Sequence, residues 1–301
     1  MTPFIVGLVA FSAVLHLAWN VRLKRAGDPL RAATIGMLAA SVGIVPAGIV
    51  AWWLGGRVAL APEGVVLGLV SGVIEAAYFI LLAAAYRRGD LSVVYPLARG
   101  TAPLLAVAIG VGVFGERLGV AGSLGIVGLL FGFLMLQRPW RALALARGGR
   151  AGVRRAARDS AILFALAAGV MIATYTAIDR VGTRLIDPVP YAAILWATCS
   201  IILVVWVALV AGGDLMGDGP QAARRAAVGG WLTLVAYLFI LIALSVAPLS
   251  GVAPLRESAT VFAAAWGSVR MGEASDRSEA TRRIGASVLI VVGALLLALG
   301  S

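Results

Sequence analysis

Apolar stretches of nearly bilayer-spanning length recur throughout this chain of 301 residues, and they restrict it to one class of fold. A helix needs about 20 mostly apolar residues to cross the hydrocarbon core of a membrane. Because 61% of the residues are hydrophobic and only 13% are charged, the chain lacks the polar surface of a soluble protein. We therefore predict an all-α integral membrane protein with ten transmembrane helices, over residues 4–19, 32–53, 64–86, 91–114, 118–136, 160–177, 190–211, 228–246, 249–269 and 284–299.

The distribution of Lys and Arg predicts how these helices are oriented. The connections after the first, third, fifth, seventh and ninth windows hold 19 Lys and Arg residues, whereas those after the second, fourth, sixth and eighth hold 4. Because cytoplasmic loops of membrane proteins are enriched in Lys and Arg, we expect the first set in the cytoplasm and both termini outside. Topology then explains the net charge of +11, and we expect no nucleic-acid partner.

Residues that carry common catalytic chemistry are scarce in this sequence. A single cysteine, Cys199, and a single histidine, His16, exclude a disulfide framework and a His/Cys metal cluster. The sequence also lacks the Gly-x-x-x-x-Gly-Lys-Ser/Thr, Gly-x-Ser-x-Gly and His-Glu-x-x-His motifs of nucleotide-binding and hydrolytic proteins. We therefore expect no metal, no cofactor and no enzymatic activity, and a gradient as the driving force of any transport.

The sequence is internally duplicated. Offsets of 159 and 157 residues align His16–Asn20 with Tyr175–Asp179, Leu97–Arg99 with Pro254–Arg256, and Gly115-Glu116 with Gly272-Glu273. Because each copy holds five helices, an odd number, the second copy enters the membrane from the opposite side and forms an inverted repeat, as in many secondary transporters. We predict a first five-helix repeat over residues 1–137, a basic cytoplasmic linker over 138–159 and a second repeat over 160–301.

Charged residues inside the windows are the first candidates for a substrate site, and they are Glu75, Arg99, Arg256 and Glu257. A charge at a helix centre costs on the order of 3 kcal/mol, so each such residue is expected to have a function and a partner. Since guanidinium groups suit carboxylates and phosphates, we predict that Arg99 and Arg256 bind an anionic group of the substrate. Glu75 or Glu257 would serve as counter-charge, proton site or amine contact. The alternative is that Arg–Glu pairs only hold helices together.

Prolines accompany both arginines. Pro96 and Pro103 share a window with Arg99, and Pro254 precedes Arg256 by two residues. Proline removes a backbone hydrogen bond and kinks a helix, and the freed carbonyl must face protein or water rather than lipid. We therefore predict kinked helices that form a polar pocket at mid-depth.

Further candidates are aromatic and polar side chains within the windows. The candidate substrate contacts are Tyr78, Tyr95, Tyr175, Tyr237 and Trp266. The candidate proton or polar relay residues are Glu75, His16, Asn20, Asp179 and Glu257. His16 and Asn20 are four residues apart and share one helix face, as do Tyr175 and Asp179. For His16, a satisfied buried histidine is the alternative to a proton relay.

Several of these segments resemble the EamA-type transporters of the drug/metabolite transporter superfamily. The resemblance lies in His16-x-x-Trp19-Asn20, Gly89–Ser92, Tyr95–Gly100, Gly115–Leu118, Pro254–Glu257 and Gly272-Glu273, and it covers nearly the whole chain. It implies a ten-helix bundle of two inverted five-helix repeats in a bacterial inner membrane, which exports or exchanges small metabolites by alternating access. Members of the family handle amino acids, drugs, sugars or phosphorylated compounds, so no particular substrate is implied.

From the residues and the resemblance together, we expect a secondary transporter of a small metabolite such as an amino acid or organic anion. Its central cavity is expected between the third, fourth, eighth and ninth helices. The expected partners are the substrate, membrane lipid and a coupling proton or ion, whereas the oligomeric state is not predicted. A channel-like facilitator or an integral membrane lipid-modifying enzyme are the alternatives.

Overall fold

In the computed structural model of the chain, every described segment of regular secondary structure is helical. The structure describes residues 1–24, 27–88, 91–137, 152–210, 212–257 and 277–300. Their helices are α1 (Pro3–Lys24), α2 (Pro29–Leu54), α3 (Pro62–Arg88), α4 (Leu91–Gly112), α5 (Val120–Gln137), α7 (Gly152–Leu185), α8 (Pro188–Leu209), α9 (Pro220–Val246), α10 (Leu249–Glu257) and α12 (Arg277–Gly300).

The helices overlap the predicted apolar windows, although α7, α9 and α12 begin seven or eight residues before theirs. By length and composition, five helices of the described residues are able to cross a membrane: Pro29–Leu54, Pro62–Arg88, Ser160–Leu185, Pro188–Leu209 and Pro220–Val246. Shorter apolar helices lie at Pro3–His16, Gly100–Gly112 and Val120–Gly132. Of the predicted ninth window, the structure describes only the part that belongs to α10. The chain is thus an all-α protein with several membrane-spanning helices in its described part.

Large apolar side chains cover the outside of the bundle. Val42 is 70% exposed, Ile201 64% and Phe131 58%. Soluble monomers rarely expose contiguous apolar surface of this kind, because it would face water. These exposed side chains are therefore suited to contact with the hydrocarbon chains of lipids.

Proline and capping residues fix where several helices begin. Asp28 precedes Pro29 at the start of α2, and its carboxylate Oδ1 accepts hydrogen bonds from the backbone N–H groups of Leu30 (2.8 Å) and Arg31 (3.1 Å). Such a side chain satisfies N–H groups that the helix leaves free, and proline is suited to the first helical position. Pro188 and Pro220 likewise begin α8 and α9, although these two helices have no side-chain capping bond.

Helix α7 begins earlier than its apolar window, residues 160–177, suggests. α7 starts at Gly152, so it includes the last residues of the predicted linker 138–159, whereas residues 138–151 lie outside the described part of the chain. Residues 152–159 are rich in Ala and Arg, which favour helix, but they are too polar to count toward a membrane window. Hydropathy therefore marked the membrane-spanning part of the helix and missed its polar extension.

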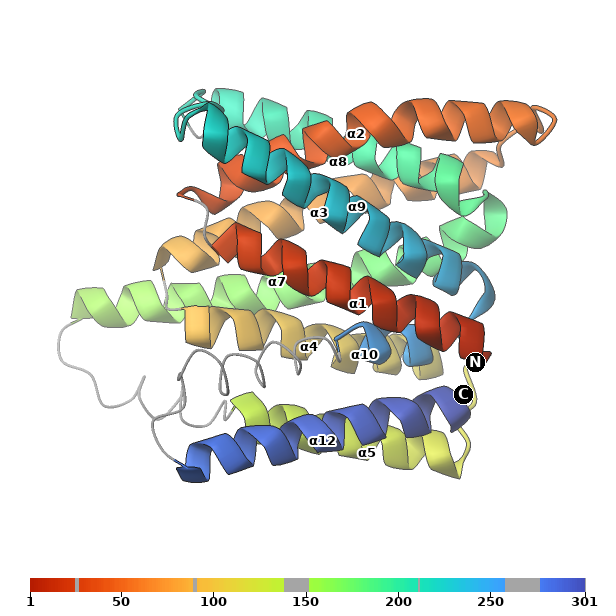
Figure 1. Cartoon of the computed structure of the whole chain (residues 1–301), viewed down its shortest axis with the longest axis vertical. Helices are drawn as coiled ribbons and strands as arrows, with labels where there is room; N and C mark the ends of the chain where they lie inside the picture. The colour runs from red at the N-terminus through yellow and green to blue at the C-terminus, as the bar shows by residue number, and fades with distance from the viewer. Residues whose placement is uncertain (25–26, 89–90, 138–151, 211, 258–276, 301) are drawn as a thin grey trace.

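The two halves of the chain are interleaved within one bundle (Figure 1). The most extensive helix contacts are α5 with α12, α3 with α7, α2 with α8, α4 with α7 and α1 with α9. Each joins a helix that precedes residue 138 to one that follows residue 151. Both termini lie at the same end of the bundle (Figure 1). The core is therefore largely the interface between the halves.

Small residues allow some of these helices to approach closely. Gly64, Gly68 and Gly72 follow one another at four-residue intervals along one face of α3, and Gly68 and Gly72 pack against α8. A Cβ atom at Gly72 would lie 2.7 Å from the carbonyl oxygen of Leu195. The backbone of α8 cannot move aside as a flexible side chain can, so the close contact at Gly72 requires glycine.

Replacing Gly72 by alanine should therefore push α3 away from α8. We expect Gly72→Ala to lower the melting temperature of the detergent-purified protein by several degrees. Gly7→Ala in α1 is the matched control, because a Cβ at Gly7 meets nothing within 4 Å. Equal melting temperatures for the two variants would contradict the close approach.

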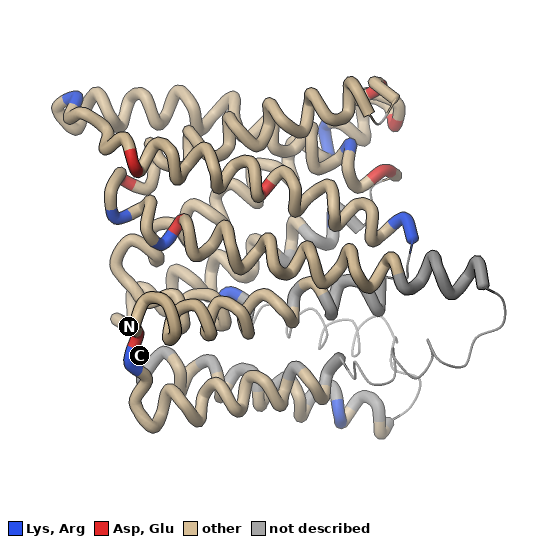
Figure 2. The backbone as a smooth tube through the Cα atoms, turned by 180° about the vertical axis from the view of Figure 1, so that it is seen from behind, with Lys and Arg blue, Asp and Glu red and all other residues tan. Residues whose placement is uncertain are grey.

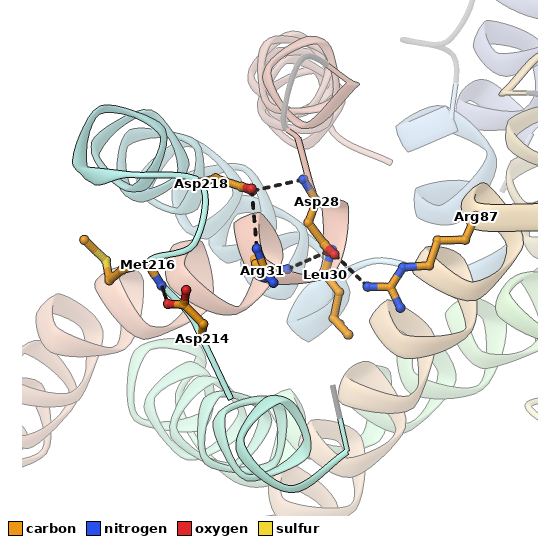
Figure 3. A network of polar contacts seen from close by, with 7 residues as sticks. All are labelled: Asp28, Leu30, Arg31, Arg87, Asp214, Met216 and Asp218. Atoms are coloured by element: carbon orange, nitrogen blue, oxygen red, sulfur yellow. Dashed lines mark hydrogen bonds and ion pairs between the residues drawn. The ribbon is translucent and has the colours of Figure 1, made fainter. Parts of the chain in front are cut away.

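A polar network, drawn in Figure 3, joins three segments. It lies at the end of the bundle opposite the termini, where α1 and α3 end and α2 and α9 begin (Figure 1). Arg87 Nη2, at the end of α3, donates to Asp28 Oδ2 at 2.7 Å. Asp218, in the α8–α9 connection, accepts the backbone N–H of Asp28 at 3.1 Å and lies 3.5 Å from Arg31 Nη1. Figure 2 shows other Lys, Arg, Asp and Glu residues at helix ends. The connections after the first, third and seventh predicted helices thus lie at one end, as the charge pattern requires.

This network gives the stability a dependence on pH through Asp28. Burial alone raises the pKa of this carboxyl, but the Arg31 N–H, the Arg87 guanidinium and the Leu30 N–H outweigh burial and lower it below its ordinary value of 3.8. A carboxyl with a lowered folded-state pKa stabilises the fold above its unfolded pKa and loses that effect as the pH falls through the folded value.

Asp28→Asn should therefore lower the melting temperature at pH 7, and the difference from the unchanged protein should shrink below about pH 4. Asp187→Asn is the control, since Asp187 precedes α8 without a side-chain capping bond. A difference that stays constant from pH 7 to pH 3 would refute the ionic role of Asp28.

Candidate functional site

The carboxylate of Asp179 in α7 is fully buried and receives hydrogen bonds from three hydroxyl groups. Ser71 of α3 donates to Oδ1 at 2.5 Å, and Tyr191 of α8 donates to the same atom at 2.8 Å. Tyr237 of α9 donates to Oδ2. Hydrogen bonds to charged groups are stronger than neutral ones, so this arrangement satisfies a charge that water cannot reach. Four helices thus meet at one carboxylate.

A second buried carboxylate lies beside it. Glu75 sits midway along α3, one turn after Ser71, and is 5% exposed. The charges of Asp179 and Arg256 both act on it. Within the described part of the chain, its buried Oε2 has no hydrogen-bond partner. Buried polar atoms without a partner are costly and uncommon, so Oε2 is open to a proton or to a polar group of a ligand.

Arg256 supplies the positive charge of the cluster. It is buried at the end of α10, and its guanidinium carbon lies 5.6 Å from the centre of the Tyr237 ring. A cation over an aromatic face is attracted to the ring's electrons. Tyr237 therefore contacts both charges, because its hydroxyl binds Asp179 while its ring lies beside Arg256. We call Asp179, Glu75, Arg256 and Tyr237 the charged cluster.

Aromatic rings pack around the charged cluster. Ring centres are 6.1 Å apart for Tyr78 and Tyr175, 5.7 Å for Tyr175 and Tyr237, and 5.6 Å for Trp196 and Tyr237. All four side chains are buried. Tilted and edge-on rings at these distances pack favourably and have few rotamers, so they hold the charges in place.

The charged cluster extends from the middle of the bundle toward the end that carries the termini. Glu75 marks the middle of α3, whereas Asp179 lies about two turns from the end of α7. Arg256 lies about two turns from the start of α10. The residues therefore sit deep inside the membrane-spanning part rather than at its surface.

The structure brings together Glu75, Tyr78, Tyr175, Asp179, Tyr237 and Arg256, which are the predicted site residues that it describes in this region. Others lie elsewhere or cannot be placed. His16 is half-buried in α1, Pro103 is buried in α4, and Pro254 lies within α10. Arg99, Tyr95 and Pro96 on α4, Asn20 on α1 and Glu257 on α10 have side chains outside the described part, as does the whole of Trp266. The roles of all these residues stay predictions.

Sequence reasoning missed Ser71 and Tyr191. Ser71 precedes Glu75 by four residues and so shares its helix face, which is a signal that was available. Tyr191 stands near the start of α8, and nothing in its spacing points to Asp179. Because α7 and α8 contribute Asp179 and Tyr191, the cluster involves the sixth and seventh predicted helices in addition to those expected to line the cavity.

The Gly115-Glu116 pair connects the halves near this site. Gly115 has a φ of 64°, which glycine adopts without strain. The Glu116 carboxylate then accepts the backbone N–H groups of Leu249 (2.7 Å) and Ser250 (2.9 Å), and its Oε1 lies 3.9 Å from Arg180 Nε. A carboxylate is favourable at a helix N-terminus. Glu116 thus caps α10, which carries Arg256, whereas the repeated pair Gly272-Glu273 lies outside the described residues.

Neutralising Asp179 should destabilise the protein. In Asp179→Asn, the amide nitrogen cannot accept the hydroxyl hydrogen bonds, and each buried hydroxyl that loses its acceptor costs about 1–3 kcal/mol. We expect the melting temperature in detergent to fall by several degrees, with Asp187→Asn, at an exposed aspartate of the same half, as the control. An Asp179→Asn variant as stable as the unchanged protein would show that the network does not hold the core.

Comparison with known proteins identifies the class of this chain. A solved structure described only as "Crystal structure of protein" matches 100% of both chains with 19% identity and a TM-score of 0.70, so the two share a fold. No curated protein matches the chain. Residues 159–299 match the model of the EamA-like transporter family. Over residues 159–299, the resemblance predicted from the sequence is therefore confirmed, because this part of the chain matches the EamA-like transporter family.

Proposed function

We propose that this protein is a secondary transporter that moves a small metabolite across a bacterial inner membrane by alternating access, in export or exchange. The family to which its second half belongs is a transporter family, which also argues against an enzyme. The proposal includes ten transmembrane helices in two inverted five-helix repeats, the first from α1 to α5 and the second from α7 to α12.

The pattern of helix contacts supports the repeats. In the proposed repeats, α1, α2, α3, α4 and α5 correspond in that order to α7, α8, α9, α10 and α12. When each helix is replaced by its counterpart, the α1–α9 contact becomes the α3–α7 contact. Likewise, the α2–α9 contact becomes the α3–α8 contact. The α2–α8, α4–α10 and α5–α12 contacts map onto themselves, and all of these contacts occur. A two-fold axis in the membrane plane produces this pattern, as in other inverted-repeat transporters.

The observation that carries the proposal is the charged cluster itself. Charges inside a membrane are expensive and are found where substrates or ions pass. Glu75 comes from the first half, whereas Asp179 and Arg256 come from the second, so the site lies between the halves. Glu75 Oε2 has no partner within the described part, although Asp179 is fully supplied with donors. Asp179 therefore has a structural role, and Glu75 is left for a proton or ligand.

The chemistry of the cluster supports a substrate with an anionic group, such as an amino acid or an organic anion. Arg256 would bind that group through its planar guanidinium, and Glu75 would contact an amine or exchange a proton. Arg99 would add a second guanidinium, since α4 packs against α10. The contacts of Asp218 with Arg31 at one end and of Glu116 with α10 at the other would break alternately as the halves rock.

The test is a ligand screen followed by transport in proteoliposomes. Amino acids, organic acids, phosphate esters and cationic drugs are tested for a rise in melting temperature, because a ligand that binds the folded state stabilises it. Each compound that stabilises the protein is then used, radiolabelled, in counterflow. We expect counterflow well above that of empty liposomes, and a loss of at least tenfold in Glu75→Gln and in Arg256→Gln.

Glu63→Gln is the matched control for Glu75→Gln, since Glu63 is an exposed acid in the first turn of the same helix. The control should transport as the unchanged protein does. Transport that Glu75→Gln leaves unaffected would remove Glu75 from the mechanism. Flux without counterflow would favour a channel-like facilitator, and no flux of any compound would count against transport.

A further inference from the structure

A separate cavity of about 550 Å³ lies at the end of the bundle opposite the termini. It is lined by the C-terminal end of α1, the N-terminal ends of α2 and α9, and the α8–α9 connection. None of the residues of the charged cluster lines it. We propose that this cavity is a binding site for a phosphate-bearing anion, independent of the transported substrate.

The lining of the cavity is positively charged. Arg22, Arg31 and Arg225 line the cavity, and Asp218 is the one acid among its described lining residues. The described lining therefore carries an excess of about two positive charges, which favours a phosphate group with about one negative charge in a diester or about two in a monoester. Guanidinium groups also match the geometry of phosphate oxygens.

The arginines are available to a ligand. Arg31 Nη1 lies 3.5 Å from Asp218 Oδ1, and both side chains are about one-third exposed. Figure 3 shows this pair within the polar network. Arg22 donates to the carbonyl oxygen of Ala18 in its own helix. Arg225 is exposed, and within the described residues it forms no ion pair. Loose pairs at an exposed site contribute little, so a phosphate would displace them easily.

The start of α9 adds to the positive potential. Gly219 is the N-cap of α9 and offers no side chain to the free N–H groups of the first turn, where Ala222 and Ala223 line the cavity. The N-terminal end of a helix attracts anions. The arginines define the site, and the helix end reinforces their charge.

The floor of the cavity is apolar and extends toward the core. Trp19 is 4% exposed, and its ring packs so closely on α9 that a Cβ at Gly229 would lie 2.5 Å from it. Ile35 and Ala226 continue this surface. A phosphate ester with an apolar portion fits such a site better than a free inorganic ion. Two sources share this chemistry, namely an anionic phospholipid headgroup and a soluble phosphate ester.

The experiment titrates the full-length detergent-purified protein with two ligands, phosphatidylglycerol and glycerol 3-phosphate, with phosphatidylcholine as the zwitterionic reference. Melting temperature and native mass spectrometry report binding. The test variants are Arg225→Gln and the double variant Arg22→Gln/Arg225→Gln. The matched control is Arg57→Gln/Arg224→Gln, which removes the same charge from exposed arginines that do not line the cavity.

We expect phosphatidylglycerol or glycerol 3-phosphate, but not phosphatidylcholine, to stabilise the unchanged protein and the control. Affinity should fall at least tenfold in the double variant and less in Arg225→Gln. A response to phosphatidylglycerol alone identifies a lipid site, and a response to glycerol 3-phosphate identifies a site for soluble esters. Equal affinities in the double variant and the control, or no response to either ligand, would overturn the proposal. Counterflow in these variants reports on the proposed transport separately.

Discussion

The hydrogen bonds that enclose the Asp179 carboxylate form the contact on which the rest of the core depends. A bare carboxylate deep in hydrocarbon would be prohibitively costly, so its donors must come from protein. Ser71 belongs to the first half of the chain, while Tyr191 and Tyr237 belong to the second. The charge is satisfied only when both halves are assembled. This requirement links α3, α7, α8 and α9. It also brings Glu75 and Arg256 close enough for their charges to interact.

Contacts between the halves recur at both ends of the bundle, and they differ in character. At one end, Glu116 is largely buried and holds the first turn of α10 through two short charge-assisted hydrogen bonds. At the other, Arg31 and Asp218 form a longer, partly exposed pair beside an open cavity. Exposed pairs are weak, whereas buried charged hydrogen bonds are costly to break. The Glu116 contact is therefore the stronger of these two contacts between the halves.

The apolar windows predicted the positions of the helices because membrane solvent imposes a length and a composition on each segment. Mid-helix charge then pointed to Glu75 and Arg256, and the duplication pointed to Asp179 through its alignment with Asn20. Tyr191 escaped prediction because its contact with Asp179 depends on how α7 and α8 fold back at Asp187. The polar start of α7 was missed because a hydropathy window does not detect a helix that leaves the membrane. The cavity at Arg225 depends on the meeting of two chain segments, residues 19–35 and 215–226, which no local pattern encodes.

Cys199 offers the most direct test of the central claim that the charged cluster is an access site rather than a closed clamp. This cysteine is the only one in the chain, is fully buried in α8, and lies within electrostatic reach of Glu75. The measurement is its rate of modification by a membrane-impermeant charged thiol reagent, added separately to whole cells and to inside-out vesicles. The account predicts slow modification from both sides, as the site opens to each in turn. Modification only after denaturation, or from one side alone, would contradict it.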